Sequence, residues 1–207
     1  MFRNLGWAAH FRMMRTYFGI SAVLFLAGIV TGVTATGLTD FLEQQIQGIR
    51  ELSDIINRSS NPTLMAIVVI FINNAKIAGF IIYLGFLFGI YPAVLMVLNG
   101  MVIGYLMHQY YAVEGMSRML EVLFKGILPH GIIEIPVIIL ASAYGLRSGN
   151  IAFRWLGCLV NSSRAKAMGK ETKQYLMMTL PVLLGIVLLL LAASLIESTI
   201  TPYLLQK

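Results

Sequence analysis

Residues 174–196 read QYLMMTLPVLLGIVLLLLAASLI, a run of 23 residues without a charged side chain. A helix needs about 20 predominantly apolar residues to cross the hydrocarbon core of a bilayer. The rest of the 207-residue chain has a similar character, because 58% of its residues are hydrophobic and only 12% are charged. Soluble domains carry about 45–50% apolar and about 25% charged residues. The composition therefore excludes a water-soluble fold and predicts an all-α, polytopic membrane protein.

Four more segments of the chain are long and apolar enough to cross a membrane. The five expected spans cover residues 16–39, 63–88, 92–110, 126–146 and 174–196. The second and third are separated at Gly89–Pro92, because proline favours the start of a helix and disfavours its interior. No Gly/Ser-rich linker divides the chain, so we expect one membrane domain over residues 1–207.

The basic residues are distributed unevenly about these spans. Of the 15 Lys and Arg residues, nine precede the first span or lie in the loop 147–173. Five spans place these two segments on the same side, and the positive-inside rule assigns that side to the cytoplasm. We therefore expect a multi-pass cell-membrane protein with a cytoplasmic N-terminus and an outside C-terminus. The basic loop is expected to contact anionic lipid headgroups, and nothing else supports nucleic-acid binding.

Residues 39–58 are expected to form an amphipathic helix on the outer surface. Apolar side chains recur at helical spacing from Phe41 to Ile56, and polar ones fill the other face. Asp40 and Glu43 are three residues apart, which predicts Asp40 as the N-cap of a capping box. The helix is interfacial, a lid on the spans, or a docking surface for a partner. Residues 1–16 mix aromatic and basic side chains, which predicts a segment along the cytoplasmic interface.

Glycines recur at a spacing of four residues in the expected spans and at their ends. The pairs are Gly28/Gly32, Gly85/Gly89, Gly100/Gly104 and Gly145/Gly149. Small residues at this spacing let the backbones of two membrane helices approach closely. We expect these faces to pack helices together, and dimerisation through one of them is the alternative.

A small set of polar residues lies inside the expected spans: Asn73, Asn74, Lys76, Asn99, His130 and Glu134. An ionisable side chain near the centre of a bilayer costs about 2.5–3.5 kcal/mol on insertion scales, so it usually faces a partner or a cavity. His130 and Glu134 are four residues apart, which places them on one face of a helix. We expect these six residues to form an intramembrane polar site.

Three interpretations of this polar site are open. In the first it is structural, and Glu134 pairs with Lys76. In the second, His130 and Glu134 form a proton relay or an ion site. In the third they bind a metal ion, with His108 as the third ligand. Two ligands do not make a metal site, so no metal or other cofactor is predicted.

Signatures of catalysis are missing from the sequence. It contains no Gly-x-Ser-x-Gly, His-Glu-x-x-His or Walker motif. The single Cys158 excludes an intramolecular disulfide and a cysteine-based zinc site. We therefore predict no catalytic residue and do not expect an enzyme.

Three polar motifs follow one another in an order that points to a family. They are Phe71-Ile72-Asn73-Asn74, Leu98-Asn99-Gly100 and Leu128-Pro129-His130-Gly131-Ile132-Ile133-Glu134-Ile135-Pro136. Over about residues 65–150 the chain resembles the stage II sporulation protein M family of membrane proteins. The resemblance implies a scaffold that recruits a peptidoglycan-degrading partner and another anchored subunit into a membrane complex during engulfment. It does not imply an enzyme.

Two functions follow as hypotheses. The first is a non-enzymatic scaffold or subunit of a membrane complex, in sporulation or cell-envelope remodelling. It would meet other membrane proteins, or copies of itself as a homo-oligomer, through the outer helix and the glycine faces. The alternative is a small transporter or channel component that uses the polar site around His130 and Glu134, because a pure scaffold needs no ionisable group inside the membrane.

Overall fold

A computed structural model describes residues 7–160 and 165–206 of the chain, and in these residues the fold is all-α, as predicted. Six α-helices follow one another: α1 Trp7–Thr34, α2 Thr39–Asn57, α3 Pro62–Tyr83, α4 Ile90–Glu121, α5 Leu128–Val160 and α6 Ala165–Leu205. Short 3-10 turns, η1 (Thr36–Leu38) and η2 (Leu84–Phe86), and a π-helical turn, η3 (Val122–Ile127), connect some of them.

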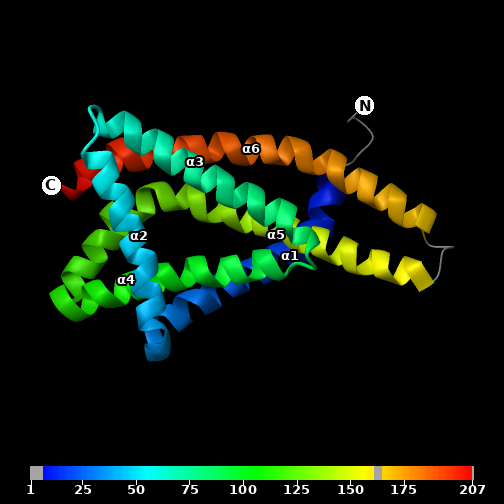
Figure 1. The fold of residues 1–207 in the computed structure, drawn as a ribbon, viewed down its shortest axis with the longest axis horizontal. Helices are drawn as coiled ribbons and strands as arrows, with labels where there is room; N and C mark the ends of the chain where they lie inside the picture. Colours follow the sequence, from blue (N-terminus) through cyan, green and yellow to red (C-terminus); the bar gives the residue numbers. More distant parts are fainter. Residues whose placement is uncertain (1–6, 161–164, 207) are drawn as a thin grey trace.

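Four described segments are long and apolar enough to cross a membrane: 9–34, 62–84, 90–158 and 165–205. The third has 69 residues, and as one straight helix it would be about 100 Å long. It instead contains α4 and α5, which run in opposite directions (Figure 1). The bundle therefore has five long helices. The chain leaves helical geometry at Gly115 (φ 84°, ψ −179°) before it turns back.

The ends of the bundle have different elements. Figure 1 shows α2, the start of α3, the turn between α4 and α5 and the end of α6 together at the left. We call this the α2 end. The start of α1, the end of α5 and the start of α6 lie toward the opposite end. An odd number of long helices brings the two ends of the chain to opposite ends of the bundle.

Proline and glycine mark the helix starts that the sequence indicates. Asn61 caps α3 by accepting a hydrogen bond from the Leu64 N–H (3.1 Å), and Pro62 follows it. The break at Gly89–Pro92 is confirmed, because Gly89 (φ 76°) has a left-handed backbone at the start of α4. A residue with a Cβ would be strained there.

One local prediction is wrong. The first residue of α2 is Thr39 and its N-cap is Leu38, so Asp40 lies inside the first turn and caps nothing. Glu43 accepts a hydrogen bond from the Tyr105 hydroxyl (3.1 Å), which directs its carboxylate toward α4. Residues 7–16 form the first part of the continuous helix α1, and their location along the cytoplasmic interface stays a prediction. Residues 1–6 lie outside the described part of the chain.

The glycine pairs form two helix–helix contacts inside the chain. A methyl group on Gly28 would overlap the Val97 carbonyl, and one on Gly100 would overlap the Phe25 carbonyl, so α1 and α4 are in backbone contact. Gly32 and Gly104 extend this contact. In the second contact, Gly85 and Gly89 lie against Gly145 and Gly149 of α5. All four faces are occupied within the chain, which leaves other surfaces for a partner.

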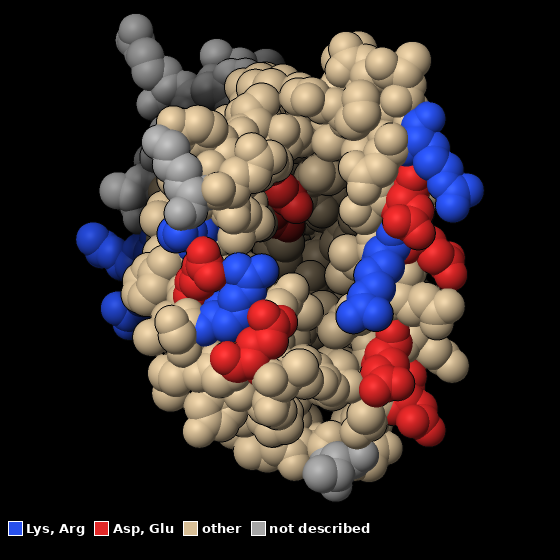
Figure 2. Space-filling view, turned by 90° about the vertical axis from the view of Figure 1, so that its left-hand side faces the viewer, with Lys and Arg blue, Asp and Glu red and all other residues tan. Residues whose placement is uncertain are grey.

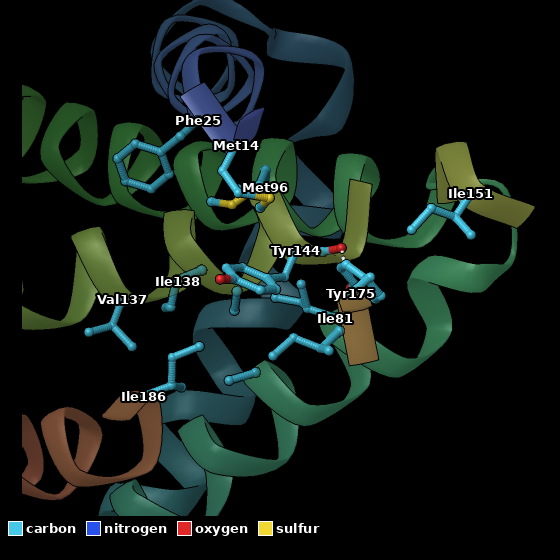
Figure 3. Packing of buried hydrophobic residues seen from close by; sticks show 14 of the residues in the cluster. Met14, Phe25, Ile81, Met96, Val137, Ile138, Tyr144, Ile151, Tyr175 and Ile186 are labelled. Carbon is cyan, nitrogen blue, oxygen red and sulfur yellow. Dashed lines mark hydrogen bonds between the residues drawn. The ribbon is translucent and has the colours of Figure 1, made fainter. Parts of the chain in front are cut away.

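Large apolar and aromatic side chains fill the centre of the bundle (Figure 3). Tyr144 and Tyr175 are fully buried, and the Tyr175 hydroxyl donates to the Tyr144 carbonyl (2.8 Å). The outside of the bundle is also apolar: Val23, Val30 and Leu184 are each more than half exposed. An apolar outer surface of this extent fits a bilayer and not water.

Candidate intramembrane cation site

His130 and Glu134 lie near the start of α5, one turn apart. The Nε2 atom of His130 is 4.0 Å from Oε2 of Glu134, so the pair has the proximity that its spacing predicts. Helix α5 continues through Pro136 without a break. This face of α5 packs between α3 and α6, because each of these three helices contacts the other two.

A third ionisable residue, Glu197 of α6, completes the group. Its Oε2 atom is 3.9 Å from the same Nε2 atom of His130. Sequence reasoning missed Glu197, because the fifth expected span ends at residue 196, one residue before it. Helix α6 continues to Leu205. The sequence does contain a signal, because apolar residues on both sides of Glu197 favour a longer helix.

Asn74 of α3 holds one oxygen of the Glu134 carboxylate. Its side-chain amide donates to Oε1 of Glu134 (2.9 Å), and Asn74 is itself buried. The Asn73 amide donates in turn to the Asn74 amide oxygen at 3.4 Å. The other Glu134 oxygen, Oε2, faces His130. Three helices thus contribute to one cluster, which includes Asn73, Asn74, His130 and Glu134 of the expected polar site.

The structure does not bring Lys76, Asn99 or His108 to this cluster. Lys76 is exposed and forms no ion pair with Glu134, because two residues along a helix correspond to a turn of about 200° and Asn74 takes the inward position. Asn99 donates to the Leu95 carbonyl of its own helix (2.8 Å), and His108 is exposed.

The cluster is recessed but not sealed. The side chains of His130, Glu134 and Glu197 are 15%, 19% and 30% exposed, respectively, so the protein leaves part of each uncovered. Figure 2 views the α2 end and shows a hollow there, with acidic atoms set back inside it and charged side chains on both sides. The ion pairs of Arg118 and Lys125 with Glu121 (2.8 and 3.0 Å) belong to the turn between α4 and α5.

Several polar groups in this region have no partner. In the described residues, neither Glu134 nor Glu197 forms a salt bridge with Lys or Arg. The buried Nδ1 of His130 and the buried hydroxyls of Ser198 and Thr201 also lack a hydrogen bond. Buried polar groups are nearly always bonded to protein or to water. Two carboxylates and an imidazole with unsatisfied neighbours form a site that can hold protons or a cation.

A second network of polar residues is buried in the bundle, and its members contact one another. His10 and Tyr144 are 2.6 Å apart at Nε2 and the hydroxyl, and Ser21 donates to Ser142 (3.0 Å). Arg147 is buried, donates to the Met14 sulfur (3.4 Å) and lies over the Tyr175 ring at 5.5 Å. These contacts join α1 to α5 and α6, so we assign them to packing.

Comparison with known proteins identifies the family. No curated protein and no solved structure matches the chain. A family model described as stage II sporulation protein M matches residues 21–202, which include α2 to α5 entirely, the second half of α1 and most of α6. The match contains all three members of the cluster, His130, Glu134 and Glu197. The chain, a helical membrane protein, therefore belongs to the stage II sporulation protein M family.

Proposed function

We propose that this membrane protein is a small, non-enzymatic transporter or channel component that binds a cation at His130, Glu134 and Glu197. One observation carries the proposal. Two carboxylates approach the same imidazole nitrogen at 4.0 and 3.9 Å inside the bundle, without a Lys or Arg partner in the described residues. Ionisable groups inside a membrane usually mark an ion or substrate path.

A purely structural role explains this cluster poorly. Burying a charge without a partner is costly, and the cost falls only when the charge is neutralised. If Glu134 and Glu197 served packing alone, amides of the same shape would fill the space without that cost. The Asn74 amide donates to Glu134 but brings no positive charge. A proton or a cation in the cluster would supply the missing positive charge.

The direction of access follows from the distribution of charge. The basic segments at residues 7–16, 147–160 and 165–173 lie toward the end opposite the α2 end (Figure 1). By the positive-inside rule we place that end in the cytoplasm and the α2 end outside. The N-terminus is then cytoplasmic, the C-terminus is outside, and the basic loop meets anionic lipid headgroups. The hollow in Figure 2 opens to the outside in this arrangement.

Flux measurements on the purified protein in liposomes test the proposal. We expect cation or proton flux from the wild type, and a loss of at least about tenfold in Glu134→Gln and Glu197→Gln with unchanged folding. Glu171→Gln is the matched control, because Glu171 pairs with Arg154 in the basic loop region and should keep full flux. If Glu134→Gln and Glu197→Gln keep wild-type flux and only melt earlier, the cluster is structural and the proposal fails.

One observation favours a second function, that of a scaffold in a membrane complex for sporulation or cell-envelope remodelling. On α2 only Leu42 is buried, while Ile49 and Ile55 are 56% and 54% exposed. This apolar surface is available to another membrane protein or to a second copy in a homo-oligomer. Ile49→Glu with Leu52→Glu should then reduce the recovery of partners, and Gln47→Glu on the polar face should not. Normal recovery with both apolar replacements would count against the scaffold.

A further inference from the structure

We propose that His130, Glu134 and Glu197 coordinate a divalent transition-metal ion, for which Zn²⁺ is the probe. This inference rests on the proposed cation site and names its ion. It differs from the metal site that the sequence suggested, because the third ligand is Glu197 of α6 and not His108, which is exposed. The three donors come from two packed helices, so the site exists only in the folded bundle.

The separations of the donor atoms suit a single ion. One ligand atom from each residue can be chosen so that all three lie within 4.8 Å of one another. A tetrahedral Zn²⁺ with bonds of about 2.0–2.2 Å has ligand atoms about 3.3 Å apart. The pairs at 3.9 and 4.0 Å need to approach by about 0.6–0.7 Å, and the pair formed by the two carboxylates, which is within 4.8 Å, by at most about 1.5 Å. Glutamate has three rotatable side-chain bonds, so this movement requires no change in the helices.

The types of donor point to the class of ion. One imidazole nitrogen and two carboxylates form a mixed set, whereas Mg²⁺ and Ca²⁺ take oxygen ligands and soft ions such as Cu⁺ take sulfur. Imidazole suits Zn²⁺ and its transition-metal neighbours. Cys158, the single cysteine, lies 24 residues from Glu134 toward the other end of α5 and does not join the set. Three protein ligands leave a position open for water, as in zinc sites that exchange a ligand.

Charge balance favours a divalent ion over a monovalent one. Glu134 and Glu197 carry two negative charges when ionised, and no described Lys or Arg forms a salt bridge with either. A divalent ion neutralises both carboxylates at once. A single proton or a monovalent ion leaves one charge in a low-dielectric environment, where it is costly.

Neighbouring groups support this coordination independently. Asn74 donates to Oε1 of Glu134 and leaves Oε2 directed at His130. This orientation lets one metal ion be coordinated by both Glu134 and His130. On α6, Thr201 follows Glu197 by four residues, so the two lie on the same helix face. The Thr201 hydroxyl is buried, the residue is 8% exposed, and the hydroxyl has no hydrogen-bond partner. A water on the open position of the ion would supply one.

Equilibrium dialysis of the purified full-length protein against Zn²⁺, followed by metal analysis, tests the inference. We expect stoichiometric Zn²⁺ in the wild type and loss of at least about 100-fold in affinity in His130→Gln and Glu197→Gln. Asn74→Leu should weaken binding by about 10- to 100-fold, the range for a residue that orients a ligand. His108→Gln is the matched control and should bind as the wild type does. Equal binding by His130→Gln and His108→Gln would overturn the inference.

X-ray absorption on the zinc-loaded wild type keeps the test valid if a variant does not fold. We expect nitrogen and oxygen ligands only, with the signature of one imidazole. A sulfur ligand, two or more imidazoles, or no bound zinc would overturn the assignment. The proposed function fails separately: stoichiometric Zn²⁺ without flux in liposomes supports the metal site and rejects transport. Proton flux without Zn²⁺ binding rejects the metal site and leaves the transport proposal standing.

Discussion

Asn74 shows how one side chain sets the geometry of the site. It reaches from α3 to Glu134 of α5 with a 2.9 Å hydrogen bond and is buried. Asn73, its neighbour, is exposed and makes only a 3.4 Å contact with Asn74. The two asparagines therefore have the same chemistry and different surroundings, and their replacements can be compared directly.

We predict that Asn74→Leu destabilises the protein by about 0.6–2 kcal/mol, the range for a hydrogen bond between membrane helices. The Glu134 carboxylate loses its donor in this variant. Asn73→Leu should change stability by less than half as much. Unfolding of both variants in the same detergent measures the difference. Equal losses would mean that the hydrogen bond from α3 contributes nothing specific.

The site residues show which parts of it were predictable from sequence. His130 and Glu134 were predictable as a pair, because a spacing of four places them on one helix face. Lys76 was not excluded by the sequence, because the rotation of α3 depends on which of its neighbours packs inward, and Asn74 does. Glu197 was missed because a charged residue normally marks the end of a span, and here it faces another helix.

At the scale of the helices, the backbones of α1 and α4 pack directly against each other. Gly28 and Gly32 of α1 lie against α4, and Gly100 and Gly104 of α4 lie against α1. Without side chains at these positions the two backbones approach closely, and dispersion contacts take the place of a hydrophobic driving force. The family match includes all of α4 and the second half of α1, where Gly28 and Gly32 lie.

We expect Gly100→Ala to destabilise the protein by about 1–3 kcal/mol, the usual cost of overpacking. The added methyl group would overlap the Phe25 carbonyl, and backbone cannot move aside as the end of a side chain can. Gly19→Ala is the control on α1, because nothing lies within 4 Å of the position that its methyl group would take. Thermal unfolding of the two variants measures the effect. If Gly100→Ala is as stable as Gly19→Ala, the backbones of α1 and α4 are not in close contact at Gly100.

Helix positions followed from the sequence better than helix lengths did. Each of the five apolar runs falls mainly on one of the five long helices, but the run 16–39 extends beyond the end of α1 at Thr34 and the run 63–88 extends beyond the end of α3 at Tyr83. Helix α6, however, has 41 residues and extends beyond residues 174–196 at both ends. Charged residues such as Lys170 end an apolar run, but they have good helix propensity and let the helix continue into polar surroundings. The N-cap of α2 was mispredicted because Glu43 bonds to Tyr105 of α4, a tertiary contact that no local pattern contains.

At the scale of the whole molecule, the two ends differ in charge and in shape. The α2 end has the hollow and side chains of both signs (Figure 2). Basic residues outnumber acidic ones near the start of α6, toward the other end, where Lys166, Lys170 and Lys173 accompany the single acid Glu171. Positive charge is retained on the cytoplasmic side of a membrane. The side of the membrane to which the site opens thus depends on how basic residues are distributed over the entire chain.

Labelling in intact cells reads this orientation directly. In a Cys158→Ala background, Arg50→Cys puts a thiol on the exposed surface of α2, and Lys166→Cys puts one at the exposed start of α6. We predict that a membrane-impermeant thiol reagent labels Arg50→Cys in whole cells and labels Lys166→Cys only after the cells are opened. The reverse pattern would place the hollow on the cytoplasmic side. The cation site would then load from the cell interior, and the charge asymmetry of the chain would not be what sets its topology.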